Sequence, residues 1–173
     1  TFTLLMRRAG WDVVYLGANV PAEAMIPTIE RVQPDLVVLS AQRLETASSL
    51  LDMARLAQDL DVPVAYGGAI FNEAPELRRR IPAHFLGTTL DRAVGAAERL
   101  LTTAHRTPDT ELPSEDAEAL RAHFLDRLPA ILADVRAALK DTQMSQSVFE
   151  ALVDTLTGAT AAALRFEDLD LLG

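Results

Sequence analysis

A serine and a pair of glycines each follow an apolar stretch of this chain. Ser40 ends the run Asp35–Ser40 ("DLVVLS"), and Gly67–Gly68 follow the run Val62–Tyr66 ("VPVAY"). A serine hydroxyl can hydrogen-bond a heteroatom of a buried ligand, and paired glycines let the flat part of a ligand lie against the backbone. The ordinary alternatives are a turn cap for the serine and a strand-ending turn with positive φ for the glycines.

Both stretches belong to a regular alternation of apolar runs and segments with helical periodicity. β-Rich runs are expected at Asp12–Leu16, Asp35–Ser40, Val62–Tyr66 and, more weakly, His84–Leu86. The second and third runs are almost wholly apolar, which predicts strands buried on both faces of a parallel sheet. In doubly wound α/β domains with this rhythm, ligands bind beyond the carboxyl ends of the strands, where the serine and the glycines would lie.

Composition and missing motifs exclude several kinds of chemistry. The 173 residues are 49% hydrophobic and include no cysteine, which excludes disulfides and thiolate metal sites. The chain has neither G-x-G-x-x-G nor G-x-x-x-x-G-K-[ST], the usual cradles of nucleotide phosphates, and no G-x-S-x-G nucleophile turn. Its histidines, at 84, 105 and 123, have no partner at ligand spacing. We therefore predict neither catalytic residues nor a metal site.

The net charge of −9 is concentrated in the last two fifths of the chain. Residues 107–173 contain 5 Lys and Arg against 13 Asp and Glu. Because an acidic surface repels phosphate backbones, direct binding of nucleic acid by this chain is not expected. No apolar run approaches the roughly 18 to 20 residues that span a bilayer, so no membrane partner and a cytoplasmic location are expected.

Two segments resemble the cobalamin-binding domain shared by corrinoid enzymes, corrinoid methyl carriers, and cobalamin-dependent transcriptional regulators and photoreceptors. The segments are "RRAGWDVVYLGANVPAEAMIPTIERVQPDLVVLSAQ" and "VPVAYGGAIFNEAPELRRRIPAHFLGTTLDRAV". The resemblance runs from Thr1 to about His105 and is closest to the regulator group. It implies an α/β, flavodoxin-like doubly wound parallel sheet, with adenosyl- or methylcobalamin as cofactor.

The resemblance also implies roles for six residues. Ser40 matches the family serine near the dimethylbenzimidazole of the cofactor's nucleotide tail, and Gly67 and Gly68 match the pair that lets this tail pass. Gln42 stands where leucine or threonine is usual in that serine motif. The other two expected contacts are Ala41, next to the serine, and Gly17, in the loop over which the corrin ring would lie.

The third family signature, D/E-x-H-x-x-G, is missing from these residues. In the family its histidine is the lower ligand of cobalt, and by the usual spacing it would lie just upstream of Thr1, together with the first strand. That strand is central in the family order 2-1-3-4-5, so without it two neighbours would lie about 9 to 10 Å apart with unpaired edges. We expect that another segment or chain supplies the strand, or that the sheet rearranges to close the gap.

The α/β domain, residues 1–106, is followed by an expected linker, residues 107–113, and a helical segment, residues 114–173. Two helices are predicted, the first capped by Ser114, and each carries an apolar stripe. The stripes are Leu120, Phe124, Leu128, Ile131, Val135 and Leu139 on the first helix, and Val148, Leu152, Leu156, Ala159 and Ala163 on the second. Two such helices cannot bury both faces alone, so we expect them to pack on the domain, in a homo-oligomer or on a partner protein.

These observations favour a cobalamin-binding sensory or regulatory module that couples ligand or light state to protein assembly, and not a stand-alone enzyme. Two alternatives stay open. The chain would instead be a corrinoid methyl carrier of a methyltransferase system, or a cobalamin-free protein-interaction domain of the same fold.

Overall fold

A computed structural model of the chain describes all residues except 19, 61, 103–107, 109–114, 139–145 and 167–173. The chain divides into two compact units, Thr1–Glu111 and Leu112–Gly173. The expected linker, residues 107–113, lies outside the described residues apart from Pro108. In the part of the chain that the structure describes, no helix is both long and apolar enough to cross a membrane.

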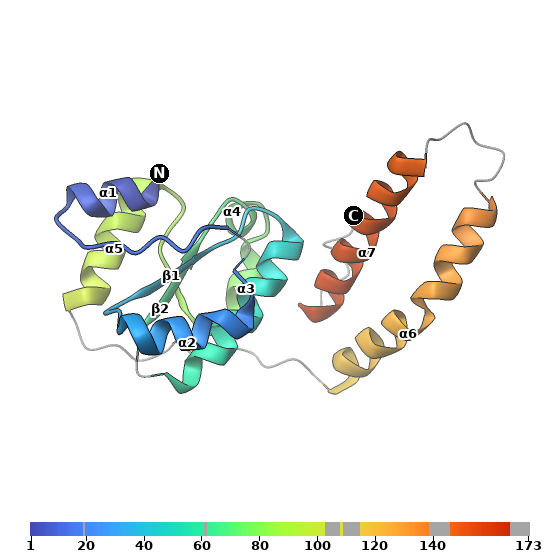
Figure 1. Ribbon diagram of the computed structural model, residues 1–173, viewed down its shortest axis with the longest axis horizontal. Helices are drawn as coiled ribbons and strands as arrows, with labels where there is room; N and C mark the ends of the chain where they lie inside the picture. The colour runs from blue at the N-terminus through green and yellow to red at the C-terminus, as the bar shows by residue number, and fades with distance from the viewer. Residues whose placement is uncertain (19, 61, 103–107, 109–114, 139–145, 167–173) are drawn as a thin grey trace. The chain divides into compact units, whose positions relative to one another are not determined.

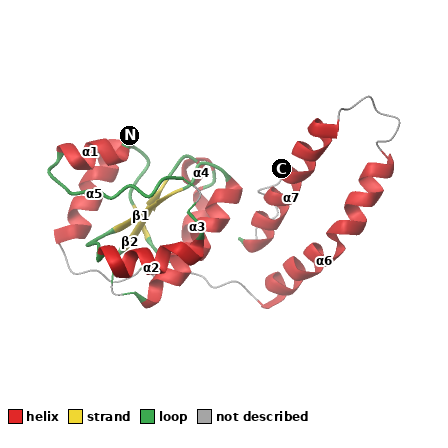
Figure 2. Cartoon of the chain, in the orientation of Figure 1, coloured by secondary structure: helices red, strands yellow, loops and turns green. Residues whose placement is uncertain are grey.

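The first unit is an α/β domain whose described residues form a three-stranded parallel sheet of order β1-β2-β3 (Figures 1 and 2). Its elements are α1 (Phe2–Arg8), α2 (Ala22–Val32), β1 (Val37–Ser40), α3 (Leu44–Leu56), the 3-10 helix η1 (Ala57–Asp59), β2 (Val64–Gly67), α4 (Ile70–Glu73), the 3-10 helix η2 (Pro75–Arg80), β3 (His84–Phe85) and α5 (Leu90–Thr102). Helices flank the sheet, as in flavodoxin-like folds. The fold class is confirmed, and so are the strands expected within residues 35–40, 62–66 and 84–86.

The side chains of β2 point alternately to the two faces of the sheet, and helices pack against both faces. Ala65 belongs to a buried cluster with side chains of α1 and α5, and these two helices contact each other. Val64 points the other way and lines a small hollow with Ala54 and Ala57, at the end of α3. α2 in turn contacts α3. β2 is therefore buried on both faces, as its apolar sequence predicts.

An aromatic cluster joins β2 to the elements that follow it. The buried Tyr66 ring lies edge-on to Phe71 of α4, with centroids 4.8 Å apart, and 5.5 Å from the ring of Phe85 in β3. Arg78 of η2 places its Cζ 4.2 Å from the centre of the Phe85 ring, and its Nε donates to the Phe71 carbonyl oxygen at 2.8 Å. Burial raises the pKa of the Tyr66 hydroxyl above its usual range, because the ionised form would lose its hydration. These contacts hold the chain that leaves β2.

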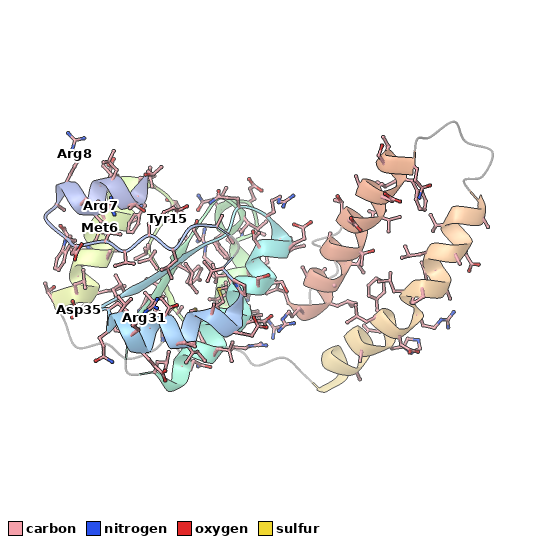
Figure 3. The ribbon with its side chains drawn as sticks, viewed as in Figure 1. Met6, Arg7, Arg8, Tyr15, Arg31 and Asp35 are labelled. Carbon is pink, nitrogen blue, oxygen red and sulfur yellow. The ribbon has the colours of Figure 1, made fainter. Side chains whose placement is uncertain are left out.

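The prediction of a strand at Asp12–Leu16 is wrong. Residues 11–17 have no regular structure, and Val14 and Tyr15 are exposed. A strand needs partners for its backbone groups, and none of the described strands flanks this segment. It is held instead from α1, where Arg7 Nη2 donates to the carbonyl oxygen of Val13 at 2.8 Å; Figure 3 shows Arg7 on the side of α1 that faces the segment.

β1 forms an open edge of the sheet. Its four residues pair with β2, and no described strand pairs with its other side. Val38 is 38% exposed and burial alternates along the strand, so the prediction of burial on both faces is wrong for β1. Nor does the described sheet rearrange to close the expected gap, because residues 11–17 do not form a strand beside β1.

The second unit contains two antiparallel helices that contact each other, α6 (Glu115–Ala138) and α7 (Gln146–Arg165) (Figure 1). Both expected helices are therefore confirmed, although Ser114 and Leu139 lie outside the described residues. On α7 the buried side chain near the start is Phe149, one position away from the predicted stripe. The stripe is open over its first three residues, since Val148, Leu152 and Leu156 are 55%, 42% and 58% exposed, whereas Ala163 at its end is buried.

Truncation of Phe71 tests the aromatic cluster. The Phe71 side chain is completely buried, so Phe71→Ala leaves a cavity beside Tyr66 and should lower the free energy of unfolding by about 3 to 5 kcal/mol. Leu90→Ala, at an exposed position of α5, is the control and should cost less than about 1 kcal/mol. Urea unfolding followed by circular dichroism measures both. A cost for Phe71→Ala no larger than that of the control would show that the cluster does not stabilise the domain.

Candidate functional site

The carboxyl ends of β1 and β2 bring together five of the six predicted site residues: Ser40, Ala41, Gln42, Gly67 and Gly68. Ser40 is the register partner of Gly67, and the N–H of Ala41 donates to the Gly67 carbonyl oxygen at 3.0 Å. Register partners in neighbouring strands point to the same face of a sheet. The side chain of Ser40 therefore lies beside the place where Gly67 has none.

Gly68 is required by the backbone itself. Its φ is +130°, and a Cβ at this position would lie 1.8 Å from the carbonyl oxygen of Ala41. No side chain fits at such a distance, and L residues rarely adopt this φ. The ordinary explanation, a strand-ending turn that needs positive φ, is therefore correct for this glycine.

Gly67 has a different environment from its neighbour. Its φ is not in the positive region, and a Cβ there would meet no atom within 4 Å. The turn explanation does not apply to it, because the backbone would accept a side chain. The open space next to the Ser40 hydroxyl is thus the feature of this glycine that a ligand could use.

Gln42 connects the loops that follow the two strands. Its Nε2 donates to Ser40 Oγ at 3.1 Å, and its Oε1 accepts from the N–H of Ala69 at 3.3 Å. Thr46 of α3 supports this loop, because its Oγ1 accepts from the N–H groups of Gln42 and Arg43 at 3.3 and 3.1 Å. The Gln42 side chain is therefore part of the site's framework and spans it from β1 to α4.

A third loop is tied to the same region. Asn72 of α4 donates from Nδ2 to the carbonyl oxygen of Thr88, after β3, at 3.2 Å. Neither Asn72 nor the amide of Ala69 was predicted from the sequence. No motif marks either one, since their roles depend on how α4 is placed by its packing against Tyr66.

Comparison with known families assigns this domain. The profile of the B12 binding domain matches residues 3–94, which is more than half of the chain. The match includes Ser40, Ala41, Gln42, Gly67 and Gly68, which we call the strand-end group. The chain belongs to the B12-binding domain family. A search of curated proteins found no match for this B12-binding chain.

The strand-end group fits the cofactor that the B12-binding family implies. Cobalamin carries a nucleotide tail that ends in a flat base, and a flat base needs an open backbone and a polar partner. Gly67 offers the open space and Ser40 offers a hydroxyl on the same face. The open position of Gly67 and the Ser40 hydroxyl in this B12-binding domain are thus compatible with the tail.

The sixth predicted residue, Gly17, lies outside this group, and so do the histidines, which were not expected to bind a metal. Gly17, with φ of +94°, is in the irregular segment, and no hydrogen bond between described residues joins it to the strand ends. His84 begins β3 at the opposite end of the sheet, His123 is exposed on α6, and residue 105 is not described. Across the described residues, no three His, Asp or Glu side chains gather where they could hold a metal ion.

Substitution of Gly67 or of Gly68 by alanine distinguishes the roles of these two glycines in the B12-binding domain. Gly68→Ala should lower the free energy of unfolding by at least about 2 kcal/mol, because it adds backbone strain and a clash with Ala41. Gly67→Ala should unfold like the wild type, within about 0.5 kcal/mol. Urea denaturation compares the two variants. Equal losses would mean that both glycines are needed only for folding.

Proposed function

We propose that this chain is a non-enzymatic sensory or regulatory module that binds cobalamin and couples its bound state to protein assembly. The proposed forms are adenosyl- and methylcobalamin. When bound, either form supplies a cobalt–carbon bond, which is sensitive to light. The protein holds the cofactor and carries a surface whose binding partners change with the state of the bound cofactor.

Binding is assigned to the loops at the carboxyl ends of the strands. The Ser40 hydroxyl would donate to the tail base, and the space over Gly67 would receive the plane of that base. Ala41 and Gln42 would border it, and Gly17 would lie near the corrin ring. The support for this arrangement is the open Cβ position of Gly67 beside the register partner Ser40.

Assembly is assigned to the helix pair. The observation that carries this half of the proposal is the exposed stripe of Val148, Leu152 and Leu156, which lie at intervals of four residues and so share one face of α7. α6 adds the exposed Ile131 and Val135. Aligned apolar side chains left open to water favour association, because burial of their surface is stabilising. A second copy of the chain or a partner protein would cover them.

Cobalamin titration of a Gly67 variant tests the binding half. The methyl group of Gly67→Ala would occupy the space assigned to the tail base, so the affinity for methylcobalamin should fall by about tenfold or more. Gly95→Ala is a matched control, because its Cβ would make an ordinary contact 3.6 Å from Arg99, on α5. The visible spectrum of the cofactor gives both dissociation constants.

Two results would count against the binding assignment. If Gly67→Ala bound methylcobalamin as tightly as the wild type, the tail base would lie elsewhere. If the wild-type chain bound no cobalamin, the proposed function would fail as a whole, and a cobalamin-free interaction role would replace it.

Light scattering after size-exclusion chromatography tests the assembly half. The chain loaded with adenosylcobalamin should change its molar mass between darkness and illumination. Leu152→Glu places a charge in the exposed stripe and should reduce the larger species, whereas Ala151→Glu, which is exposed off the stripe, should not. An unchanged molar mass, together with methyl turnover in the presence of a methyltransferase partner, would identify a carrier instead of a sensor.

A further inference from the structure

The orientation of the Gln42 amide is decided by its two hydrogen bonds. The backbone N–H of Ala69 can only donate, so the Gln42 atom that faces it must be the oxygen. The amide nitrogen then faces Ser40, and because an amide NH₂ can only donate, Ser40 Oγ must accept. The hydroxyl of Ser40 is therefore engaged as an acceptor on its Gln42 side.

This arrangement leaves the hydroxyl proton of Ser40 for another partner. Among the residues that the structure describes, none accepts a hydrogen bond from the Ser40 hydroxyl, whose one hydrogen bond is the one it accepts from Gln42. Ser40 is exposed, and its side chain lies beside the open space over Gly67. The group that fills this space would thus meet a hydrogen-bond donor.

We infer that Gln42 is a positioning residue that sets the Ser40 hydroxyl as a donor, so that the site selects cobamides whose tail base has a ring atom that accepts a hydrogen bond. A benzimidazole nitrogen is such an atom when it is not bound to cobalt. A phenolic tail ring offers no ring acceptor and would leave the serine proton unpaired once water is displaced. This inference rests on the proposed function, because it requires the tail base over Gly67.

Gln42→Glu reverses the hydrogen-bond polarity with almost no change of shape. A carboxylate can still accept from the Ala69 N–H, but its second oxygen also accepts, so Ser40 must turn its proton toward residue 42. The donor that faces the ligand is then lost. The variant should keep the fold, which urea unfolding checks, and should lose the selection between tail bases.

The experiment measures dissociation constants of two methylated cobamides, one with a benzimidazole tail and one with a phenolic tail. Gln42→Glu should weaken binding of the benzimidazole form by about tenfold and change binding of the phenolic form by less than about twofold. Gln58→Glu, an exposed residue at the opposite end of the sheet, makes the same chemical change and should alter neither. Comparing each variant with wild type on one cobamide cancels the cost of freeing its base from cobalt.

Four outcomes decide the inference. A selective loss of the benzimidazole form supports it. An equal loss of both forms, or no loss of either, overturns it and leaves the proposed function intact, whereas a wild-type chain that binds neither cobamide overturns both. If Gln42→Glu does not fold, Gln42→Leu replaces it, because a freely rotating Ser40 hydroxyl should give a selective loss of about threefold.

Discussion

The close approach of the Gly68 backbone to the carbonyl oxygen of Ala41 is the constraint on which the site depends. A Cβ at Gly68 would lie 1.8 Å from that oxygen, so the chains leaving β1 and β2 pass each other at a distance that only glycine permits. This proximity brings the Gln42 amide within reach of the N–H of Ala69, after the second strand. It also keeps Ser40 beside the open position of Gly67, its register partner.

The site lies where β2, which is buried on both faces, pairs with β1, whose other edge has no described partner. β2 is buried on both faces, and the Tyr66 ring fixes its end against Phe71 and Phe85. β1 has a described neighbour on one side only, and Val38 is partly exposed there. The position of the serine therefore depends on its pairing with β2 and on the Gln42 link, since its own strand receives little support from the opposite edge.

Much of this structure was predicted from local features of the sequence, whereas features that depend on a partner distant in the sequence were not predicted. The runs that form β1, β2 and β3 were predicted because an apolar, β-rich pattern is a local property of each run. The residues at the carboxyl ends of these runs then indicated Ser40 and the pair Gly67–Gly68. The run Asp12–Leu16 is similarly apolar, but a strand also needs a neighbour. The two glycines look alike in sequence, and only their surroundings separate a backbone requirement at Gly68 from open space at Gly67. Likewise, nothing in the letters around Gln42 indicates that it reaches Ala69.

The central claim is that the tail base of cobalamin occupies the space over Gly67. Backbone amide NMR spectra recorded while cobalamin is added to the chain test this claim most directly. The account predicts that the largest shifts occur at Ala41 and Gly67, at the carboxyl ends of the strands. Largest shifts at Val64 and His84, at the amino ends of β2 and β3, would contradict it.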